Sequence, residues 1–172
     1  MLAILLFIPL FLIRYGLLYL LNKEALVRAA HFAPMQEKEK IAFVIYQLAT
    51  IAIFTYSFFI KVKTDSTLYY LGISVYLLGV LLLILSISDF ALRQDEGLNT
   101  SGLYKLSRNP LYIAYFIYFC GGAILTQSFI LLLIVVIFQI STHWIILAEE
   151  RCCLDNFKEK YREYMTKTRR YL

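Results

Sequence analysis

Two polar segments of the chain contain the residue types that can do chemistry. Residues 96–112 read EGLNTSGLYKLSRNPLY, and residues 143–157 read HWIILAEERCCLDNF. The adjacent carboxylates Glu149 and Glu150 suit hydroxyl groups or an ammonium group. Arg108 and the free amides of a helix start suit a carboxylate or a phosphate. If the two segments face each other, they form a cleft for a ligand that is polar at one end and meets lipid at the other.

Asn109 and Pro110 also have a simpler interpretation, as the start of a helix. An Asn side chain can cap unpaired amides, and Pro suits the first helical position because its missing N–H costs nothing there. Arg108 is then only an interfacial charge whose stem lies along apolar surface. This interpretation leaves Tyr104 and Tyr112, four residues on either side of Arg108, without a role. Both interpretations stay open at this point.

Glu149 and Glu150 stand at the end of the last apolar block, where acidic groups oppose the helix dipole. The conflict eases if the helix continues into the tail. An apolar stripe at helical spacing supports such a helix, which we expect to lie on the membrane surface. The stripe consists of Leu154, Phe157, Tyr161 and Tyr164. The alternative for the two carboxylates is an ordinary ion pair with Arg151 or Arg108.

The elements that must position these residues are membrane helices. The chain has 172 residues, of which 60% are hydrophobic and 17% charged, so it is too apolar for an ordinary soluble domain. We predict an all-α fold with about five transmembrane helices and an amphipathic cytosolic helix at the carboxyl terminus. The polar break Thr126-Gln127-Ser128 predicts a tight hairpin between the last two spans. The predicted spans are 1–21, 41–60, 68–88, 111–125 and 129–148.

The distribution of Lys and Arg predicts the orientation in the membrane. With five spans, the segments that share the carboxyl-terminal side carry fourteen basic residues, and the other side carries only Lys61 and Lys63. The positive-inside rule therefore puts the carboxyl terminus and the polar segments in the cytoplasm, and the amino terminus outside. We expect one domain, made of three spans (1–88), a cytosolic loop (89–110), a helical hairpin (111–148) and a cytosolic tail (149–172).

Several other classes of site are not supported by the composition. The positive charge lies beside the spans, so it does not indicate nucleic-acid binding. The three cysteines, Cys120, Cys152 and Cys153, lack the spacing of a metal site or a disulfide framework, and we expect no metal. Residues 1–21 lack a basic start and a small-residue cleavage site, so we expect a retained span. The oligomeric state stays open.

The two polar segments together resemble the motifs of the isoprenylcysteine carboxyl methyltransferase and phospholipid methyltransferase superfamily. The first motif is roughly G-x-Y-x-x-x-R-(H/N)-P-x-Y, which residues 102–112 (GLYKLSRNPLY) fit throughout. The second begins with two Glu residues, here Glu149 and Glu150. It continues with a Leu, a Phe and two Tyr residues, which are here Leu154, Phe157, Tyr161 and Tyr164. The resemblance covers residues 96–172, nearly half of the chain.

The resemblance implies an integral-membrane enzyme that takes a methyl group from S-adenosylmethionine and releases S-adenosylhomocysteine. The residue chemistry alone permits this donor without selecting it. The resemblance places the donor on the cytosolic side, between the loop and the tail. It assigns the donor site to Glu96, Gly97, Leu98, Asn99, Tyr104, Asn109, Pro110, Leu111, Tyr112, Glu149 and Glu150. The acceptor would be a lipophilic or lipidated molecule that arrives from the membrane: an isoprenylcysteine-like carboxylate, a phospholipid amine or a small thiol or hydroxyl.

Arg108 and His143 are the candidate catalytic residues. His143 can deprotonate an amine or thiol acceptor, which needs a free lone pair, or it is only a hydrogen-bonded residue of the last span. The chain departs twice from the prenylcysteine enzymes, which carry His where Asn109 stands and a substrate-associated Arg where Ile145 stands. The Asn form resembles bacterial and phospholipid members. The missing Arg counts against a prenylcysteine acceptor.

Two other functions remain as alternatives. Membrane reductases of the sterol-reductase type, which bind NADPH, resemble a pattern in which Tyr is followed by Gly-Glu or Gly-Asp. In this chain Ile113 and Ala114 follow Tyr112, so we rank a reductase below a methyltransferase. A non-enzymatic membrane scaffold would bind neither S-adenosylmethionine nor NADPH.

Overall fold

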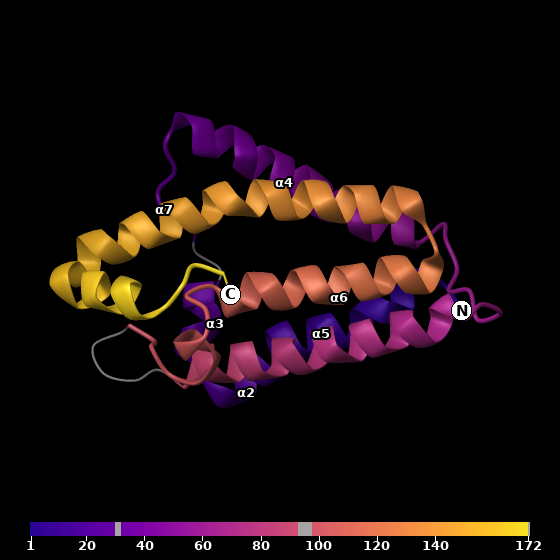
Figure 1. Ribbon diagram of the computed structural model, residues 1–172, viewed down its shortest axis with the longest axis horizontal. Coiled ribbons are helices and arrows are strands. Elements are labelled where there is room, and N and C mark those ends of the chain that lie inside the picture. The colour runs from indigo at the N-terminus through magenta and orange to yellow at the C-terminus, as the bar shows by residue number, and fades with distance from the viewer. Residues whose placement is uncertain (30–31, 93–97, 172) are drawn as a thin grey trace.

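The computed structural model describes residues 1–29, 32–92 and 98–171, and these residues form an all-α fold (Figure 1). The first apolar segment is one irregular helix made of η1 (Ala3–Phe7), α1 (Ile8–Phe11), the π-helical η2 (Leu12–Leu17) and α2 (Leu18–Leu21). The later elements are α3 (Lys23–Ala29), α4 (Glu37–Ser57), α5 (Leu68–Ala91), the 3₁₀ turn η4 (Gly102–Lys105), α6 (Pro110–Thr126) and α7 (Phe129–Lys167).

Four helices in the described part of the chain are long and apolar enough to cross a membrane. They are Ala3–Leu21, α4, α5 and α7, and they confirm the prediction of a multi-span helical protein. The fifth predicted span corresponds to α6, which is apolar but has only 17 residues. At 1.5 Å per residue such a helix is about 25 Å long, at the lower end of the range for a span.

Helix α6 lies at the centre of the bundle, beside α5 and antiparallel to α7, while α4 packs against α7 (Figure 1). Helices α5 and α6 approach each other closely because glycines stand at their contact. A Cβ atom on Gly121 would lie 2.5 Å from the Cα atom of Tyr76, and one on Gly79 would lie 2.5 Å from that of Tyr118. Small residues at such positions let two membrane helices pack backbone to backbone.

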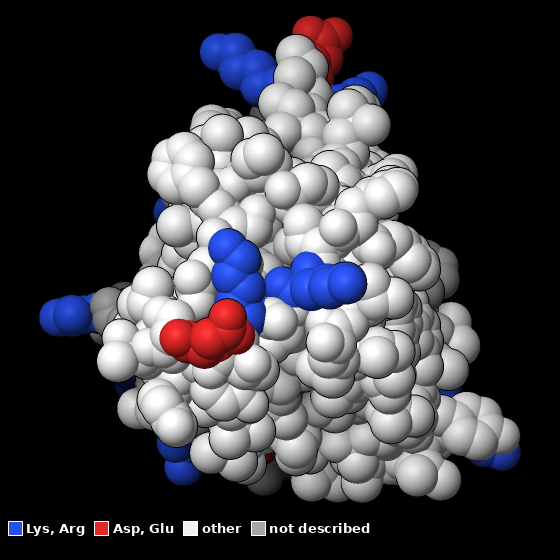
Figure 2. Space-filling view, turned by 90° about the vertical axis from the view of Figure 1, so that its right-hand side faces the viewer, with Lys and Arg blue, Asp and Glu red and all other residues white. Residues whose placement is uncertain are grey.

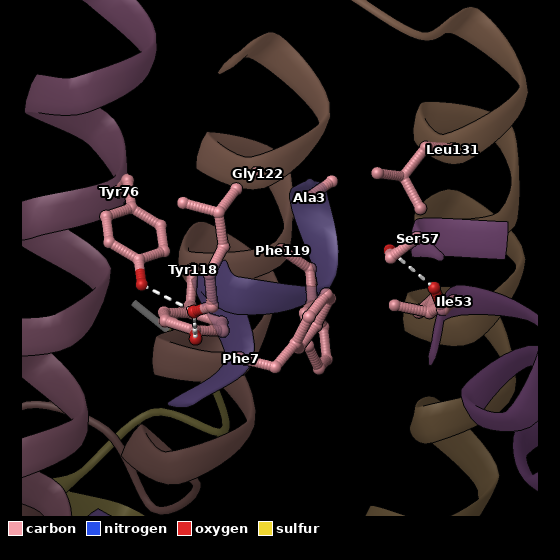
Figure 3. Close-up of a pocket in the computed structure, with 10 residues that line it drawn as sticks. Ala3, Phe7, Ile53, Ser57, Tyr76, Tyr118, Phe119, Gly122 and Leu131 are labelled. Atoms are coloured by element: carbon pink, nitrogen blue, oxygen red, sulfur yellow. Dashed lines mark hydrogen bonds between the residues drawn. The ribbon is translucent and has the colours of Figure 1, made fainter. Parts of the chain in front are cut away.

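The first helix is attached to this pair through its backbone. The hydroxyls of Tyr76 and Tyr118 both donate to the carbonyl oxygen of Leu6, which lies in the irregular segment η1 (Figure 3). The cavity beside them has a volume of about 10 Å³ and is lined mainly by apolar groups such as Phe7 and Ile53. That volume is about the size of one water molecule, so this part of the core is closely packed.

A tight turn joins α6 and α7 where the sequence has its polar break. Helix α6 ends at Thr126, Gln127 adopts a left-handed conformation (φ 50°), and the Ser128 side chain accepts a hydrogen bond from the Leu131 amide at 3.2 Å. Gln127 therefore ends α6, and the adjacent Ser128 caps the start of α7. Figure 2 shows the end of the molecule that includes this turn: a small group of charged side chains lies near the centre of the face, and others project at its edges.

Helix α7 continues past the apolar segment, as predicted, but it reverses at Lys158 (φ 46°, ψ −118°). The expectation that the apolar stripe of the tail lies on the membrane surface is wrong. Tyr161 and Tyr164 are only 4% and 8% exposed, and they pack with Leu98, Leu154 and Phe157. The reversal folds the two halves of the stripe onto each other, so protein covers the surface that lipid was expected to cover.

Candidate functional site

A cavity of about 440 Å³ lies where the loop before α6, the start of α6, the middle of α7 and the folded-back tail meet. Most of the residues predicted for the donor site, and the candidate catalytic residue Arg108, line it. These lining residues are Leu98, Asn99, Tyr104, Arg108, Asn109, Leu111, Tyr112, Glu149 and Glu150. The structure therefore brings the two polar segments of the sequence to one cavity.

Glu149 is the carboxylate of the pair that remains available to a ligand. The Tyr112 hydroxyl donates to its Oε1 at 2.6 Å, across the contact between α6 and α7. Within the described residues this is its one hydrogen bond, and its Oε2 has no protein partner there. Glu149 is half-buried and lines the cavity, so its free oxygen can accept further hydrogen bonds from a bound molecule.

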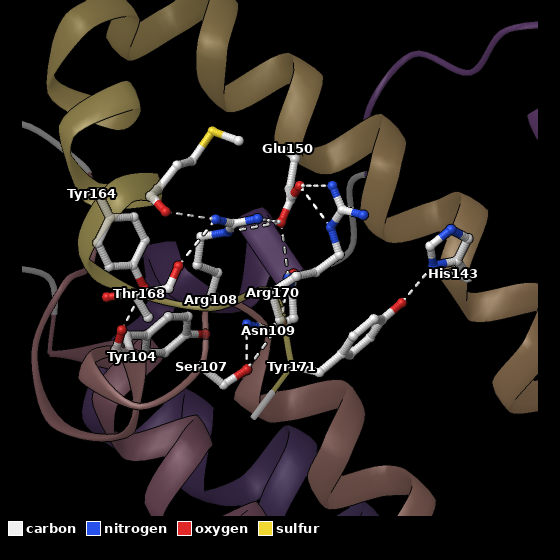
Figure 4. Close-up of polar contacts among 11 residues, drawn as sticks. Tyr104, Ser107, Arg108, Asn109, His143, Glu150, Tyr164, Thr168, Arg170 and Tyr171 are labelled. Atoms are coloured by element: carbon white, nitrogen blue, oxygen red, sulfur yellow. Dashed lines mark hydrogen bonds and ion pairs between the residues drawn. The ribbon is translucent and has the colours of Figure 1, made fainter.

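Glu150 is instead held by two arginines (Figure 4). Arg108 contacts its Oε1 through Nε and Nη2, both at 2.9 Å, and Arg170 contacts its Oε2 through Nε at 3.0 Å and Nη2 at 2.8 Å. The remaining terminal nitrogen of Arg108 donates to the carbonyl oxygens of Met165 and Thr168, at 3.2 and 3.0 Å. The ion-pair alternative is thus correct for Glu150, and this arrangement joins the loop to the tail.

Asn109 lines the cavity, but the capping bond expected from the simpler interpretation is absent. It precedes α6 and Pro110 is the first helical residue, but the Asn109 side chain makes no capping hydrogen bond. Its Nδ2 instead donates to the Arg170 carbonyl oxygen at 3.2 Å and lies 3.4 Å from Oε1 of Glu150. The amide of Arg108 donates to the Arg169 carbonyl oxygen at 2.9 Å. The motif before α6 is therefore bound to the last residues of the chain.

The loop before this motif is attached to the end of α5. The Leu103 amide donates to Oδ2 of Asp89 at 2.7 Å, and Asn99 donates to the Asp89 carbonyl oxygen. Gly102 adopts a left-handed conformation (φ +57°), which Gly accepts at little cost. Tyr104 follows this turn, and burial, with the charge of Glu149, raises the pKa of its hydroxyl above the ordinary value. Tyr104 therefore stays neutral at physiological pH.

Four of the predicted residues do not belong to the cavity as described. Glu96 and Gly97 lie outside the described residues. Pro110 starts α6 but is not among the cavity residues. His143 also lies elsewhere: its Nδ1 is 2.6 Å from the Tyr171 hydroxyl (Figure 4). Its ring meets that of Trp144 edge-on. Its position matches the alternative interpretation, a hydrogen-bonded residue of the last span.

Arg14, Tyr46 and Tyr115 line the cavity and were not predicted. Arg14 donates to the Tyr115 hydroxyl at 2.6 Å and to the Ala29 carbonyl oxygen at 3.0 Å. A signal for it was available, because Arg14 is the only charged residue among residues 1–21. An ionisable residue in a membrane span is costly and commonly functional.

Comparison with known proteins gives the family. A model of the phospholipid methyltransferase family matches residues 66–160, more than half of the chain. No curated protein and no solved structure matches. The matched segment contains α5, α6, the loop between them and the Glu pair. The match favours a methyltransferase over a reductase or a non-enzymatic scaffold. The chain belongs to the phospholipid methyltransferase family and is a multi-pass integral membrane methyltransferase that uses S-adenosylmethionine.

Proposed function

We propose that S-adenosylmethionine binds in the 440 Å³ cavity and that its methyl group passes to the amine of a membrane phospholipid. The observation that carries this proposal is the position of Glu149, a carboxylate with a free oxygen in a cavity lined by both sequence motifs. The family match supplies the reaction class, and the acceptor and the site residues are our proposal.

The residues of the cavity fit the donor. Its volume lies within the roughly 300–1,000 Å³ of ordinary ligand pockets. Glu149 can accept hydrogen bonds from ribose hydroxyls or from the ammonium group, and the rings of Tyr104 and Tyr112 offer faces to the adenine or to the sulfonium. When bound, the donor supplies an electrophilic methyl group. The protein then contributes mostly by orienting the reactants and by excluding water.

We assign Arg108 and Glu150 to positioning. All three guanidinium nitrogens of Arg108 contact Glu150 or backbone carbonyls of the tail. Both oxygens of Glu150 are occupied by arginines. Their polar atoms hold the tail over the loop, so they shape the cavity without meeting the methyl group. His143, which contacts Tyr171, is left out of the reaction.

An amine suits the acceptor position better than a carboxylate does. Ile145, at the position where the prenylcysteine enzymes carry a substrate-associated Arg, is fully buried. The carboxylate of a prenylcysteine therefore has no cation at that position. A phospholipid amine is consistent with the family, and a small lipophilic thiol or hydroxyl is the alternative.

We further propose five membrane crossings, including α6, with the carboxyl terminus and the donor site in the cytoplasm. The strong excess of Lys and Arg on that side supports this orientation. We treat residues 1–172 as a single domain, because the first helix and α7 both contribute walls to one cavity.

Methyl transfer to lipids tests the proposal. The purified protein is incubated with S-adenosylmethionine labelled in the methyl group and with vesicles that contain phosphatidylethanolamine. We expect label in the lipid fraction with the wild type and with Glu163→Gln, an exposed control, and a loss of roughly 100-fold with Glu149→Gln. Labelling of a neutral lipid alone, or equal activity of Glu149→Gln and the wild type, would overturn the proposed function.

A further inference from the structure

Arg14 is a charged residue in an otherwise apolar helix, and its guanidinium lines the donor cavity. It lies inside the π-helical segment η2 (Leu12–Leu17), a local widening that is often found at functional sites. Keeping a charge at such a position is expensive in a membrane. The contacts of Arg14 indicate which kind of ligand its charge can bind.

The direct contacts of Arg14 within the described residues are with neutral groups, and the Glu149 carboxylate acts on it only at longer range. Its Nη1 donates to the Tyr115 hydroxyl and its Nη2 to the Ala29 carbonyl oxygen, and the guanidinium carbon lies 5.7 Å from the centre of the Tyr115 ring. All of these partners are neutral. In the described ranges no carboxylate forms an ion pair with Arg14, and three of its five N–H groups have no hydrogen-bond partner there. The guanidinium can therefore take an anion through two parallel hydrogen bonds.

Arg14 and Glu149 define two ends of the cavity with opposite charge. Glu149 is held by Tyr112, in the first turn of α6, whereas Arg14 is held by Tyr115, three residues further along. Because a helix rises 1.5 Å per residue, Arg14 is attached about 4–5 Å further from the start of α6. That direction leads away from the loop and the tail and into the apolar part of the bundle (Figure 1).

The two ends also come from different parts of the chain. Glu149 and Tyr112 lie inside the segment matched by the family model, residues 66–160, whereas Arg14 and Ala29 lie before it. The methyl donor is common to the family, so the matched segment is the natural place for its binding residues. The unmatched segment is then the natural place for contacts that select the acceptor.

We propose that Arg14 binds the anionic phosphodiester of the phospholipid acceptor and so selects a zwitterionic or anionic lipid over a neutral one. This inference rests on the proposed function. A phosphodiester on Arg14 leaves the amine of the headgroup free to point toward Glu149 and the donor. Arg14 thus acts as a specificity-determining residue that touches the substrate, and Tyr115 orients it.

The test compares two acceptors in the same phosphatidylcholine vesicles, phosphatidylethanolamine and oleylamine, which has the amine but no phosphate. With Arg14→Gln we expect kcat/KM for phosphatidylethanolamine to fall roughly 10- to 100-fold, the range of a charge-assisted hydrogen-bond pair. We expect kcat/KM for oleylamine to change less than about 3-fold. Arg14→Lys should recover part of the loss, and Lys63→Gln, an exposed control at the other end, should match the wild type.

Calorimetric titration with S-adenosylhomocysteine separates the remaining explanations and reports whether each variant is folded. An unchanged affinity in Arg14→Gln is expected. An affinity that falls 10-fold or more would assign Arg14 to the donor and overturn the inference, as would an equal loss for both acceptors. Tyr115→Phe keeps the charge and removes one hydrogen bond, so a smaller loss restricted to phosphatidylethanolamine is expected.

The wild-type protein tests the proposed function separately from the role of Arg14. If the wild type binds S-adenosylhomocysteine but methylates neither acceptor, the phospholipid function is wrong and the inference falls with it. If the wild type methylates phosphatidylethanolamine and Arg14→Gln does so equally well, the function stands and only the inference is overturned.

Discussion

At the scale of single residues, two neighbouring carboxylates have separate tasks. Glu150 is 4% exposed and forms ion pairs with Arg108 and Arg170, whereas Glu149 faces the cavity with one tyrosine as its partner. Adjacent residues on a helix point about 100° apart, which follows from 3.6 residues per turn. One Glu can therefore hold the tail while the other meets a ligand.

Removal of the Glu150 charge should cost stability. Glu150→Gln leaves Arg108 buried beside a neutral amide, and the loss of one partner of a buried pair typically costs about 3–5 kcal/mol. Denaturation of the detergent-solubilised protein, followed by circular dichroism, measures this change. Glu163→Gln removes an exposed pair with Lys167 and serves as the control, for which we expect no clear change. Equal stability of the two variants would mean that the arginines find other partners.

At the scale of elements, the contact between α5 and α6 depends on its glycines. Gly121 and Gly122 offer a matched comparison, because a Cβ on Gly121 would meet the Tyr76 backbone at 2.5 Å while one on Gly122 would meet nothing within 4 Å. Gly121→Ala must therefore separate two helices, and Gly122→Ala only changes helix propensity.

We expect Gly121→Ala to destabilise the protein by at least about 2 kcal/mol, a typical cost of overpacking. Gly122→Ala should be neutral, or stabilising by up to about 1 kcal/mol. Thermal unfolding in detergent compares the two variants with the wild type. If both variants unfold like the wild type, α5 and α6 do not pack as closely as the structure has them.

The loop before α6 depends on Gly102 in the same way. Its φ of +57° disfavours a side chain, and a Cβ there would lie 2.2 Å from Oδ2 of Asp89. We expect Gly102→Ala to weaken binding of S-adenosylhomocysteine about 10-fold or more, because the loop carries Asn99 and Tyr104 into the cavity. Calorimetric titration measures this loss. Gly16→Ala, where a Cβ meets nothing within 4 Å, is the control and should bind normally.

At the scale of the whole molecule, the charge distribution predicts a cytoplasmic carboxyl terminus. The segment between α4 and α5, which carries Lys61 and Lys63, should then face the opposite side. In a variant without native cysteines, Lys63→Cys should react with a membrane-impermeant maleimide added to intact cells, and Lys167→Cys should react only after lysis. The reverse pattern would invert the proposed orientation.

Much of the fold is predictable because its signals are local. The polar break at residues 126–128 marks the α6–α7 turn, and the apolar segments give the helices nearly to their ends. The motif residues around Arg108 and Glu149 line one cavity, as the resemblance to the methyltransferase superfamily implies. Their types and their positions beside two predicted spans left the site open without that resemblance.

The missed features depend on contacts between distant parts of the chain. No Gly or Pro near Lys158 marks the reversal, and the turn is stabilised by packing of Tyr161 and Tyr164 on Leu98. The Asn109 side chain donates to the carbonyl oxygen of Arg170, 61 residues away, and does not form the expected capping bond. Arg14 was visible as an isolated charge, but its place in the cavity depends on Tyr115, 101 residues away.

The proposed function depends on binding of the methyl donor in the cavity beside Glu149. Calorimetric titration of the purified protein with S-adenosylhomocysteine, and separately with NADPH, tests it most directly. We expect binding of S-adenosylhomocysteine with a dissociation constant of roughly micromolar order. We expect the affinity to fall at least about 10-fold in Glu149→Gln and to stay unchanged in Glu163→Gln. Binding of NADPH alone, of neither compound, or of S-adenosylhomocysteine with equal affinity by Glu149→Gln would contradict it.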